Sequence, residues 1–392
     1  MAAKKNILSL GLIFMGIICH AQTDSTSNTI KNIGKFKFIG FVDAYYSYDF
    51  NNTNRQERGI LINGGSPFCS HSSQNQFAIN NVLLGVRYNH TLFRASAILH
   101  TGTYVQKNYS NEPELLKHIN EAIAGIRVVN NLWLEAGIFS SHIGVESAIS
   151  KDNINLTRSL MAENTPYFES GAKITYTTNN GKWLLSGLVL NGWQTILAFQ
   201  RPQKAFGTQI QFKPFGDKLL LNSSTYFGPA PIARNILDST GGIIATDLSK
   251  GGDFLMRYFH NFYFTYQLTD NLLVAAAFDI GFQEKTITDK ALNTWFNPTI
   301  YAKYKLSKLF GINARVEHYN DRNGIMIATS SPNNFQTTGC AVGVDYSPTE
   351  FVMLRVEGKF LAATDEVFFN QVQNKATNNT TFLTTSIAVS IP

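Results

Sequence analysis

Polar and apolar residues alternate along most of the chain, from residue 36 to the C-terminus. In the segment 310–317, apolar side chains at the even positions alternate with Gly, Asn, Arg and Glu at the odd ones, and Arg315 belongs to the second set. Segment 352–357 repeats the pattern around Arg355. A period of two residues is typical of a β-strand whose two faces meet different surroundings. Because no long stretch has the 3.6-residue period of a helix, the sequence predicts an all-β protein.

The segments between the predicted strands come in two sizes, which alternate along the chain. Short ones such as 179–182 and 270–271 carry the Asn, Asp and Gly residues that tight hairpin turns require. The pattern predicts sixteen strands joined by seven short and eight long connections. The long connections are 50–76, 106–118, 140–166, 194–204, 229–253, 284–292, 321–334 and 363–378.

This alternation favours a transmembrane barrel over a soluble β-protein. A sheet in hydrocarbon must close because it cannot leave an edge unpaired, and bacterial barrels of this kind place short turns in the periplasm and long loops outside. A soluble sandwich or propeller also has many short strands, but it has little reason to sort its loops by length. We therefore expect a transmembrane antiparallel up-and-down β-barrel of about sixteen strands, with short periplasmic turns and long extracellular loops.

The first 21 residues have the features of a secretory signal peptide. Lys4 and Lys5 precede an apolar run of about 13 residues, and Ala21 supplies a small residue just before the expected cut. The run is shorter than the roughly 20 apolar residues of a spanning helix. We expect a signal peptide at 1–21, a short periplasmic lead-in at 22–35 and an outer-membrane β-barrel at 36–392. A lipoprotein cut at Cys19 is the alternative.

The composition agrees with a chain that has one face in lipid and the other in water. Charged residues make up 15% of it, below the roughly 25% that is typical of soluble domains. Aromatic residues make up 12%, and the mean hydropathy is -0.08. An amyloid-prone or adhesive β-protein would share part of this composition. The two cysteines beyond the signal peptide, Cys69 and Cys340, make neither a disulfide scaffold nor a metal site.

The formal net charge of +6 falls to +4 without Lys4 and Lys5. The excess is spread along the chain, with no basic block and no nucleic-acid motif, so we expect no nucleic-acid partner.

If the apolar face of each strand meets lipid, the alternate residues line the lumen. A barrel of about sixteen strands is wide enough to hold an aqueous channel, and Arg or Lys facing the mid-bilayer would cost roughly 2–4 kcal/mol. The near balance of charges predicts ion pairs and transverse fields that select solutes by charge. The lumen-lining candidates are Asp43, Arg87, Arg94, Glu121, Arg127, Glu135, Glu169, Lys173, Arg257, Lys303, Arg315, Glu317, Asp345, Arg355 and Glu357. Asp279, Lys305 and Lys359 belong to the same alternating set.

The third long connection, 140–166, is a candidate constriction. In familiar sixteen-stranded porins the third external loop folds inward and narrows the channel, and by that resemblance we expect the same here. An ordinary external loop is the alternative. The charged residues of this candidate constriction are Glu146, Lys151, Asp152, Arg158 and Glu163.

No pattern in the chain indicates an enzyme, a cofactor or a metal. Ser140, Ser141 and His142 are adjacent, but adjacency does not place an imidazole against a hydroxyl, and no third group that orients the His is visible. The eight His residues show no pair at metal-ligand spacing. A Gly-rich phosphate loop is also missing.

Three short motifs resemble those of the OmpL-like β-barrel porin family. The first is the run Gly40-Phe41-Val42-Asp43-Ala44-Tyr45-Tyr46-Ser47-Tyr48-Asp49-Phe50, which is similar to the family's opening strand. The second comprises Gly137-Ile138-Phe139, Gly144, Glu146, Ser159, Pro166-Tyr167 and Gly171, and the third is Asn191-Gly192-Trp193. The resemblance implies an outer-membrane barrel with a pore function and carries no catalytic residues. The chain departs from many such barrels at its last residues, Val389 to Pro392, where an aromatic residue often serves the assembly machinery.

These observations together predict a passive channel through which small hydrophilic solutes and ions cross the outer membrane. The expected partners are outer-membrane lipid, small hydrophilic solutes and the barrel-assembly machinery, with a homo-oligomer as a further option. One rival is a substrate-specific outer-membrane transporter, whose lumen should hold a plug or an apolar binding site. The other is a non-conducting surface adhesin or structural barrel that uses loops such as 50–76 for contacts.

Overall fold

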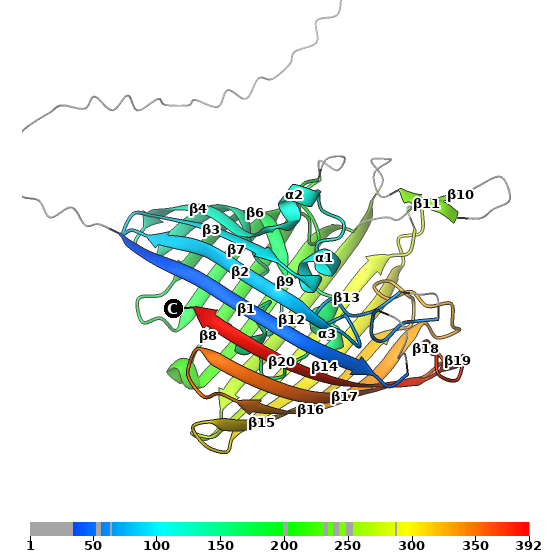
Figure 1. The fold of residues 1–392 in the computed structure, drawn as a ribbon. Coiled ribbons are helices and arrows are strands. Elements are labelled where there is room, and N and C mark those ends of the chain that lie inside the picture. The colour runs from blue at the N-terminus through cyan, green and yellow to red at the C-terminus, as the bar shows by residue number, and fades with distance from the viewer. Residues whose placement is uncertain are drawn as a thin grey trace, which may run out of the picture. The chain divides into compact units, whose positions relative to one another are not determined.

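The computed structural model describes residues 34–51, 56–62, 65–198, 203–230, 234–237, 243–247, 254–286 and 288–391. Within them, sixteen antiparallel strands follow one another around a closed barrel, which confirms the predicted fold class (Figure 1). The predicted signal peptide and most of the predicted lead-in lie outside the described residues. The barrel strands are β1 (Lys35–Asp49), β2 (Phe77–Asn89), β3 (Phe93–Thr101), β4 (Ile119–Val129), β5 (Leu132–Ser140), β6 (Phe168–Thr177), β7 (Trp183–Leu190), β8 (Ala205–Phe212), β9 (Leu219–Ala230), β12 (Leu255–Gln267), β13 (Leu272–Glu284), β14 (Leu292–Lys305), β15 (Phe310–Asp321), β16 (Phe335–Tyr346), β17 (Val352–Ala363) and β20 (Asn379–Ile391).

The alternation of side chains along each strand agrees with the two faces of a barrel wall. In β15, Phe310, Ile312 and Val316 are exposed on the outer face, whereas Arg315 and Glu317 are buried inside. The first and last strands close the ring, because β1 pairs with β20 from Gly40↔Ile391 to Asp49↔Phe382. Every barrel strand therefore has two neighbours, and no edge is left to meet lipid.

Connections of two sizes alternate around the barrel, as the sequence predicts. The short turns lie at one end, here called the short-turn end, and the long loops L1 to L8 at the other, the long-loop end. The turns are 90–92, 130–131, 178–182, 213–218, 268–271, 306–309 and 347–351. The loops are L1 (50–76), L2 (102–118), L3 (141–167), L4 (191–204), L5 (231–254), L6 (285–291), L7 (322–334) and L8 (364–378).

The remaining elements are short and lie in these connections. None of the helices in the described part of the chain has the length and apolar character needed to cross a bilayer. L2 holds α1 (Thr103–Asn108) and α2 (Glu114–Lys117), L3 holds η1 (Ser150–Asp152) and α3 (Leu160–Glu163), L5 holds the hairpin of β10 (Arg234–Leu237) and β11 (Ile243–Asp247), L8 holds the hairpin of β18 (Phe368–Asn370) and β19 (Lys375–Thr377), and η2 (Gly216–Lys218) lies in a short turn.

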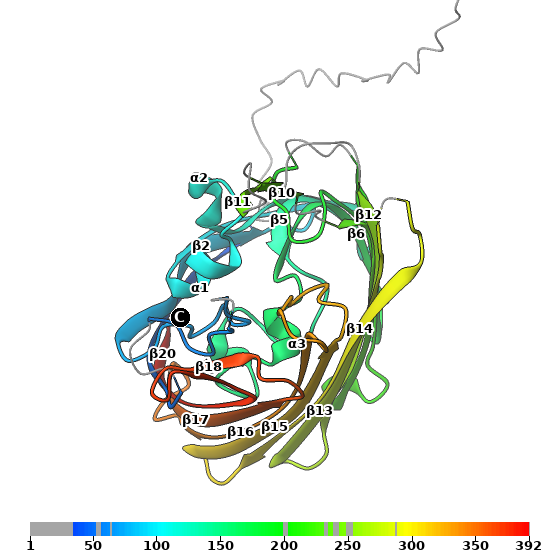
Figure 2. The same cartoon turned by 90° about the vertical axis from the view of Figure 1, so that its right-hand side faces the viewer.

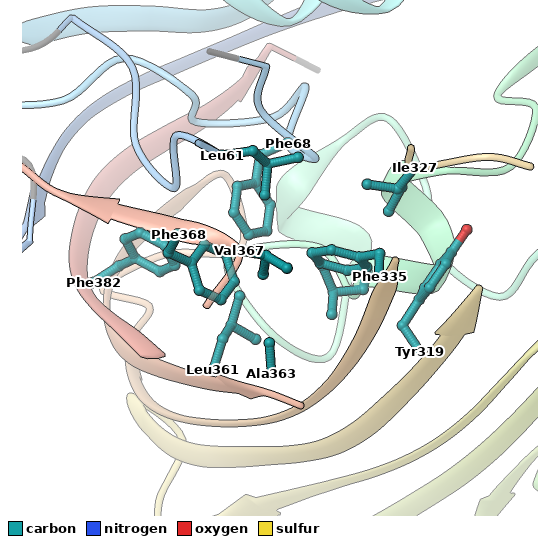
Figure 3. Close-up of a cluster of buried hydrophobic side chains, with 11 residues drawn as sticks. Leu61, Phe68, Tyr319, Ile327, Phe335, Leu361, Ala363, Val367, Phe368 and Phe382 are labelled. Carbon is teal, nitrogen blue, oxygen red and sulfur yellow. The ribbon is translucent and has the colours of Figure 1, made fainter. Parts of the chain in front are cut away.

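Several long loops turn back into the barrel instead of extending away from it. A buried apolar cluster joins Leu61 and Phe68 of L1, Ile327 of L7 and Val367 of L8 (Figure 3). Leu160 of L3 belongs to the same cluster. The sequence analysis considered an inward position only for the third long loop, so this joint packing of four loops was not predicted. Burial of their apolar side chains stabilises the folded loops at the long-loop end.

Candidate functional site

The third long loop crosses the barrel interior and reaches the wall on the far side. L3 leaves β5 and returns to β6, yet its middle part contacts β15 and β17, and α3 lies inside the ring of strands (Figure 2). At its deepest point Lys151 donates hydrogen bonds to the carbonyl of Glu350, which lies in a short turn, and to Oγ of Ser390 at 3.3 Å. L3 therefore extends from the long-loop end almost to the short-turn end.

Arg355 on β17 is one attachment point of L3. Its guanidinium donates to the carbonyl oxygens of Ser150 at 2.9 Å and Ile154 at 2.7 Å, and also to those of Asn153 and Asn155. On the wall side, Nε donates to Asp345 Oδ1 at 2.7 Å. One buried cation thus satisfies four carbonyls of a loop segment that lies about 200 residues away in the sequence.

Glu357, two residues further along β17, provides the opposite charge. Its carboxylate accepts hydrogen bonds from Leu156 N at 2.8 Å, from Thr157 N at 3.2 Å and from the Thr157 hydroxyl. The side-chain amide of Asn155 donates to the same carboxylate at 3.2 Å. Arginine binds the carbonyls of the loop and glutamate binds its N–H groups, so the wall fixes both kinds of backbone group in the same segment.

A second set of buried charges fixes the following part of L3. Arg315 on β15 donates to the carbonyls of Thr157 at 2.5 Å and Arg158 at 3.2 Å, and Lys359 donates to the latter at 3.2 Å. Glu317 pairs with Lys359 at 2.9 Å and with Arg315 at 3.3 Å. The wall charges in this region are thus covered by the loop and bonded to it, and they are not open to water.

Glu146 in the first part of L3 is also buried in this region. It accepts hydrogen bonds from Ser159 N and from the Tyr301 hydroxyl at 3.1 Å, and Arg315 lies 3.8 Å away. Burial raises the pKa of Glu146, and the positive charge of Arg315 opposes this shift. The carboxylate joins the two limbs of L3 to each other and to the wall.

Small side chains on β16 make room for this arrangement. β16 lies between the charged strands β15 and β17. Its inward positions Gly339, Ala341 and Gly343 are small and buried. A Cβ atom at Gly339 would lie 2.5 Å from a side-chain carbon of Leu361 and 3.1 Å from Cγ of Glu317. The long side chains of Glu317 and Lys359 can therefore meet on the inner side of β16, because its small residues do not block the contact.

Contacts with L1 and L2 hold the end of L3. The carboxylate of Glu163 accepts hydrogen bonds from the backbone N–H groups of Cys69, at 2.8 Å, and Ser70, at 3.1 Å. The guanidinium of Arg158 lies 4.4 Å from the ring centroid of Tyr104 and 4.1 Å from that of Tyr167. Burial raises the pKa of the Cys69 thiol to about 12, so the thiol stays protonated at neutral pH.

The opposite side of the interior, along β2 to β8, contains cavities. One of about 360 Å³ is lined by Trp133, Phe139, Lys173 and Gln209. A second of about 270 Å³ shares Lys173 with the first. A third of about 530 Å³ reaches from Lys37 on β1 to the first limb of L3. The middle of L3 thus lies against β15 and β17, and its first limb borders the third cavity.

Two arginines of this hollow side reach across a strand to their carboxylates, and a lysine pairs with a carboxylate on the neighbouring strand. Arg87 on β2 makes a bidentate contact with Glu121 on β4, at 2.9 and 3.0 Å. Arg94 on β3 lies 2.7 Å from Glu135 on β5, and Lys173 on β6 lies 3.5 Å from the same carboxylate. The structure thus brings together five of the predicted lumen-lining residues.

The other predicted residues lie on the inner wall in separate environments. Arg127 lies opposite Trp133. Lys303 pairs with Asp345 at 2.7 Å, and Asp152 is an exposed residue of L3 that lines the third cavity. Glu169 is fully buried at the start of β6.

Three of the remaining wall charges have specific partners. Asp43 pairs with His71 of L1 at 3.0 Å, and Asp279 accepts a hydrogen bond from Asn261 at 2.5 Å. Arg257 donates to Gln283 and lies 4.6 Å from the ring centroid of Trp193. Lys305 is exposed at the end of β14.

Sequence reasoning missed several partners because they carry no pattern of their own. Asn155 and Thr157 bind Glu357 from within a polar loop. Arg58 of L1 is fully buried, donates to the Ser70 carbonyl at 2.7 Å and lies 4.6 Å from the ring centroid of Phe68. Arg58 stands between Glu57 and Gly59 in a polar stretch, so its neighbours carry no signal of burial.

His142 does not pair with the neighbouring Ser140 or Ser141 in the structure. Nε2 of His142 donates to the Thr225 carbonyl at 2.8 Å, and its Nδ1 has no hydrogen-bond partner among the described residues. Burial lowers the pKa of His142 to about 4. Across the same residues, no group of three or more His, Cys, Asp or Glu side chains is placed to hold a metal ion.

Comparison with known proteins agrees with this architecture. The model of the family described as "Putative beta-barrel porin-2, OmpL-like" matches residues 35–391. The chain belongs to this porin family. It is therefore an outer-membrane porin channel, as the sequence analysis predicts. A search of curated protein sequences found no significant match.

Solved outer-membrane proteins have the same fold as this OmpL-like porin. A loop L8 deletion mutant of OmpT from Vibrio cholerae matches with a TM-score of 0.59 and 9% identity, over 92% of this chain and 100% of that one. An anion-selective porin from Comamonas acidovorans matches with a TM-score of 0.56 and 10% identity, over 91% and 100% of the two chains. The channel DcaP of Acinetobacter baumannii matches with a TM-score of 0.56 and 9% identity, over 92% and 98%. At these identities the likeness shows the fold alone.

Proposed function

We propose that this porin is a passive, water-filled channel for small hydrophilic solutes and ions, and that L3 forms its constriction. The observation that carries the proposal is the attachment of L3 to β15 and β17 by Arg315, Arg355 and Glu357. Polar cavities remain along β1 to β8, between this part of the wall and the first limb of L3. A loop held by buried charges narrows a channel without needing a separate plug.

Conductance in a planar lipid bilayer tests the role of L3. Two variants separate its volume from its contacts: one lacks residues 148–160, and the other replaces them with a Gly/Ser segment of equal length. The deletion removes Arg158 and the loop residues that bind Arg355 and Glu357, so its conductance should rise. The replacement keeps the chain length but loses the contacts, so its current should fluctuate more than that of the wild type. An unchanged conductance in the deletion variant would rule out L3 as the constriction.

Liposome swelling with sugars of graded size distinguishes a diffusion channel from its rivals. Flux that falls steadily with solute size supports passive diffusion. Saturable flux of a single solute would favour the substrate-specific transporter. A complete lack of flux would favour the non-conducting adhesin, whose partners would then bind the long loops. In each case the activity is transport or binding, and we propose no catalytic role.

Two further features complete the proposal. A signal peptide at 1–21 would direct the chain across the inner membrane, where the assembly machinery would insert it among outer-membrane lipids. Mass spectrometry of the mature protein should then find Gln22 at its N-terminus. A structural neighbour, OmpT of Vibrio cholerae, is described in a trimer form, and this supports a homo-oligomer, which the mass of the detergent-solubilised protein would test.

A further inference from the structure

The ion pairs on the hollow side of the interior are asymmetric in their exposure to water. The Arg87 side chain is 43% exposed, and its partner Glu121 is 10% exposed. Arg94 is 32% and Lys173 is 23% exposed, whereas the Glu135 that they share is 6% exposed. In all three pairs the cation is the more exposed member, although Glu121 and Glu135 also line the cavities.

The same asymmetry occurs at the short-turn end of β14. Lys303 is 28% exposed, and its partner Asp345 is 4% exposed. Asp345 also accepts hydrogen bonds from Arg355 and Asn313. The carboxylate is thus covered by three partners, and the exposed member is again a cation.

The hollow side also carries more cations than carboxylates. Arg87, Arg94, Arg127 and Lys173 lie on the inner wall of β2 to β6, where Glu121 and Glu135 are the carboxylates within their reach. Four cations against two carboxylates leave two positive charges in excess. The third carboxylate on these strands, Glu169, is fully buried at the start of β6, towards the long-loop end.

Local packing keeps these cations in place. Gly125 lies between Arg94 and Glu135 in the sheet, and a Cβ atom there would lie 2.8 Å from Cγ of Glu135. Because Gly125 has no side chain, the Arg94 side chain can extend over β4, and its guanidinium lies 4.3 Å from the ring centroid of Trp133. The ammonium of Lys173 lies 4.6 Å from the ring centroid of Phe139. Aromatic faces attract cations at these distances, so the charges are held on the surface of the cavity.

We propose that Arg87, Arg94, Arg127 and Lys173 make this channel selective for small anions. The cations outnumber the carboxylates here and are the more exposed members of the ion pairs, so the surface of the hollow is positive. A positive surface inside low-dielectric walls concentrates anions and excludes cations. This inference rests on the proposed channel function and adds to it the class of solute.

Asp152, an exposed carboxylate on the hollow side, acts in the opposite direction. Asp152 of L3 lines the third cavity together with Lys37 and Arg87. Its negative charge reduces the positive potential of the cavity. Removal of this charge should strengthen the preference for anions, which gives the experiment a variant with the opposite sign.

The experiment measures the reversal potential of the full-length channel in a planar bilayer under a KCl gradient. The wild type should be more permeable to chloride than to potassium. Arg87→Gln, Arg94→Gln and Lys173→Gln should each lower the chloride preference roughly two- to fivefold, the effect of one unit charge at about 4–8 Å in water. Asp152→Asn should raise it. Lys290→Gln is the control, because it removes an exposed cation that pairs with Glu284 next to L6, away from the hollow.

The outcomes separate this inference from the proposed function. Heat-modifiable mobility on gels verifies that each variant has folded into a barrel. A folded wild type that does not conduct would overturn the channel and the selectivity together. A conducting wild type that prefers potassium, or a preference that the three Gln variants leave unchanged, would overturn the selectivity and leave the channel intact.

Discussion

Replacement of Arg355 by Met should release the middle of L3 while leaving the barrel intact. Met keeps the length and apolar stem of the side chain but cannot donate to the four loop carbonyls that Arg355 binds. Two of those bonds, to Ile154 at 2.7 Å and Ser150 at 2.9 Å, are short. A hydrogen bond that involves a charged group contributes roughly 1.5–3 kcal/mol, so the two together account for about 3–6 kcal/mol of loop docking. About 4 kcal/mol corresponds to roughly a thousandfold change in the equilibrium between docked and released loop.

Single-channel recording measures this release as brief transitions to a higher conductance. Glu357 and Arg315 still hold L3 in the variant, so we expect more frequent openings and not a permanently wider channel. Lys303→Met is the matched control. It removes a 2.7 Å contact to the same carboxylate, Asp345, and among the described residues Lys303 makes no hydrogen bond or ion pair with L3. If Arg355→Met opens no more often than Lys303→Met, the idea that this arginine fastens the loop is wrong.

Four further predictions follow from the same contacts. Glu357→Gln leaves one carboxamide oxygen where a carboxylate accepts hydrogen bonds from Asn155, Leu156 and Thr157. This variant should raise the frequency of channel openings. The control Glu350→Gln, in an exposed turn, should not. Arg158→Met removes a cation from between the rings of Tyr104 and Tyr167. In detergent it should lower the free energy of unfolding by about 2 kcal/mol or more. An unchanged melting temperature would contradict a stabilising cation–π contact. Burial lowers the pKa of His142 from 6.5 to about 4, so the folded state favours the neutral ring. The neutral ring therefore contributes fully to the free energy of unfolding above pH 6.5. This contribution, on the order of 3 kcal/mol, is lost as the pH falls towards 4. His142→Gln should therefore unfold with a weaker pH dependence between pH 4 and 6.5 than the wild type, and equal slopes would refute this. Gly125→Ala places a Cβ 2.8 Å from Cγ of Glu135, so it should disturb the Arg94–Glu135 pair and lower the chloride preference without abolishing conductance, as the reversal potential would show.

The sequence alone was sufficient for the strands, their orientation and the two kinds of connection. In β15, the alternation around Arg315 predicts which side chains face outwards, and the structure has the same alternation. Successive side chains in a strand point to opposite faces of the sheet, so the face of each residue follows from its position along the strand. The lengths of the connections are local as well, and they were enough to predict a closed ring of sixteen strands.

The long loops also carry a sequence signal of inward packing. Leu61, Phe68, Ile327 and Val367 are apolar residues within long connections, and all four are buried in one cluster. An apolar residue in an external loop has little to gain from exposure to water. Their presence therefore indicated that L1, L7 and L8 turn inwards, although it could not indicate where they would meet.

Only the tertiary structure decided which inward charges meet water. Arg94 and Arg355 occupy equivalent positions in the pattern, since both alternate with apolar residues on a strand. In the fold, Arg94 faces a cavity and remains partly exposed, whereas Arg355 is buried beneath L3. Burial of a charge depends on which distant segment covers it, and here the covering residues, 150–157, lie about 200 positions away along the chain. A period of two can tell inside from outside, but it carries no information about contacts between segments so far apart.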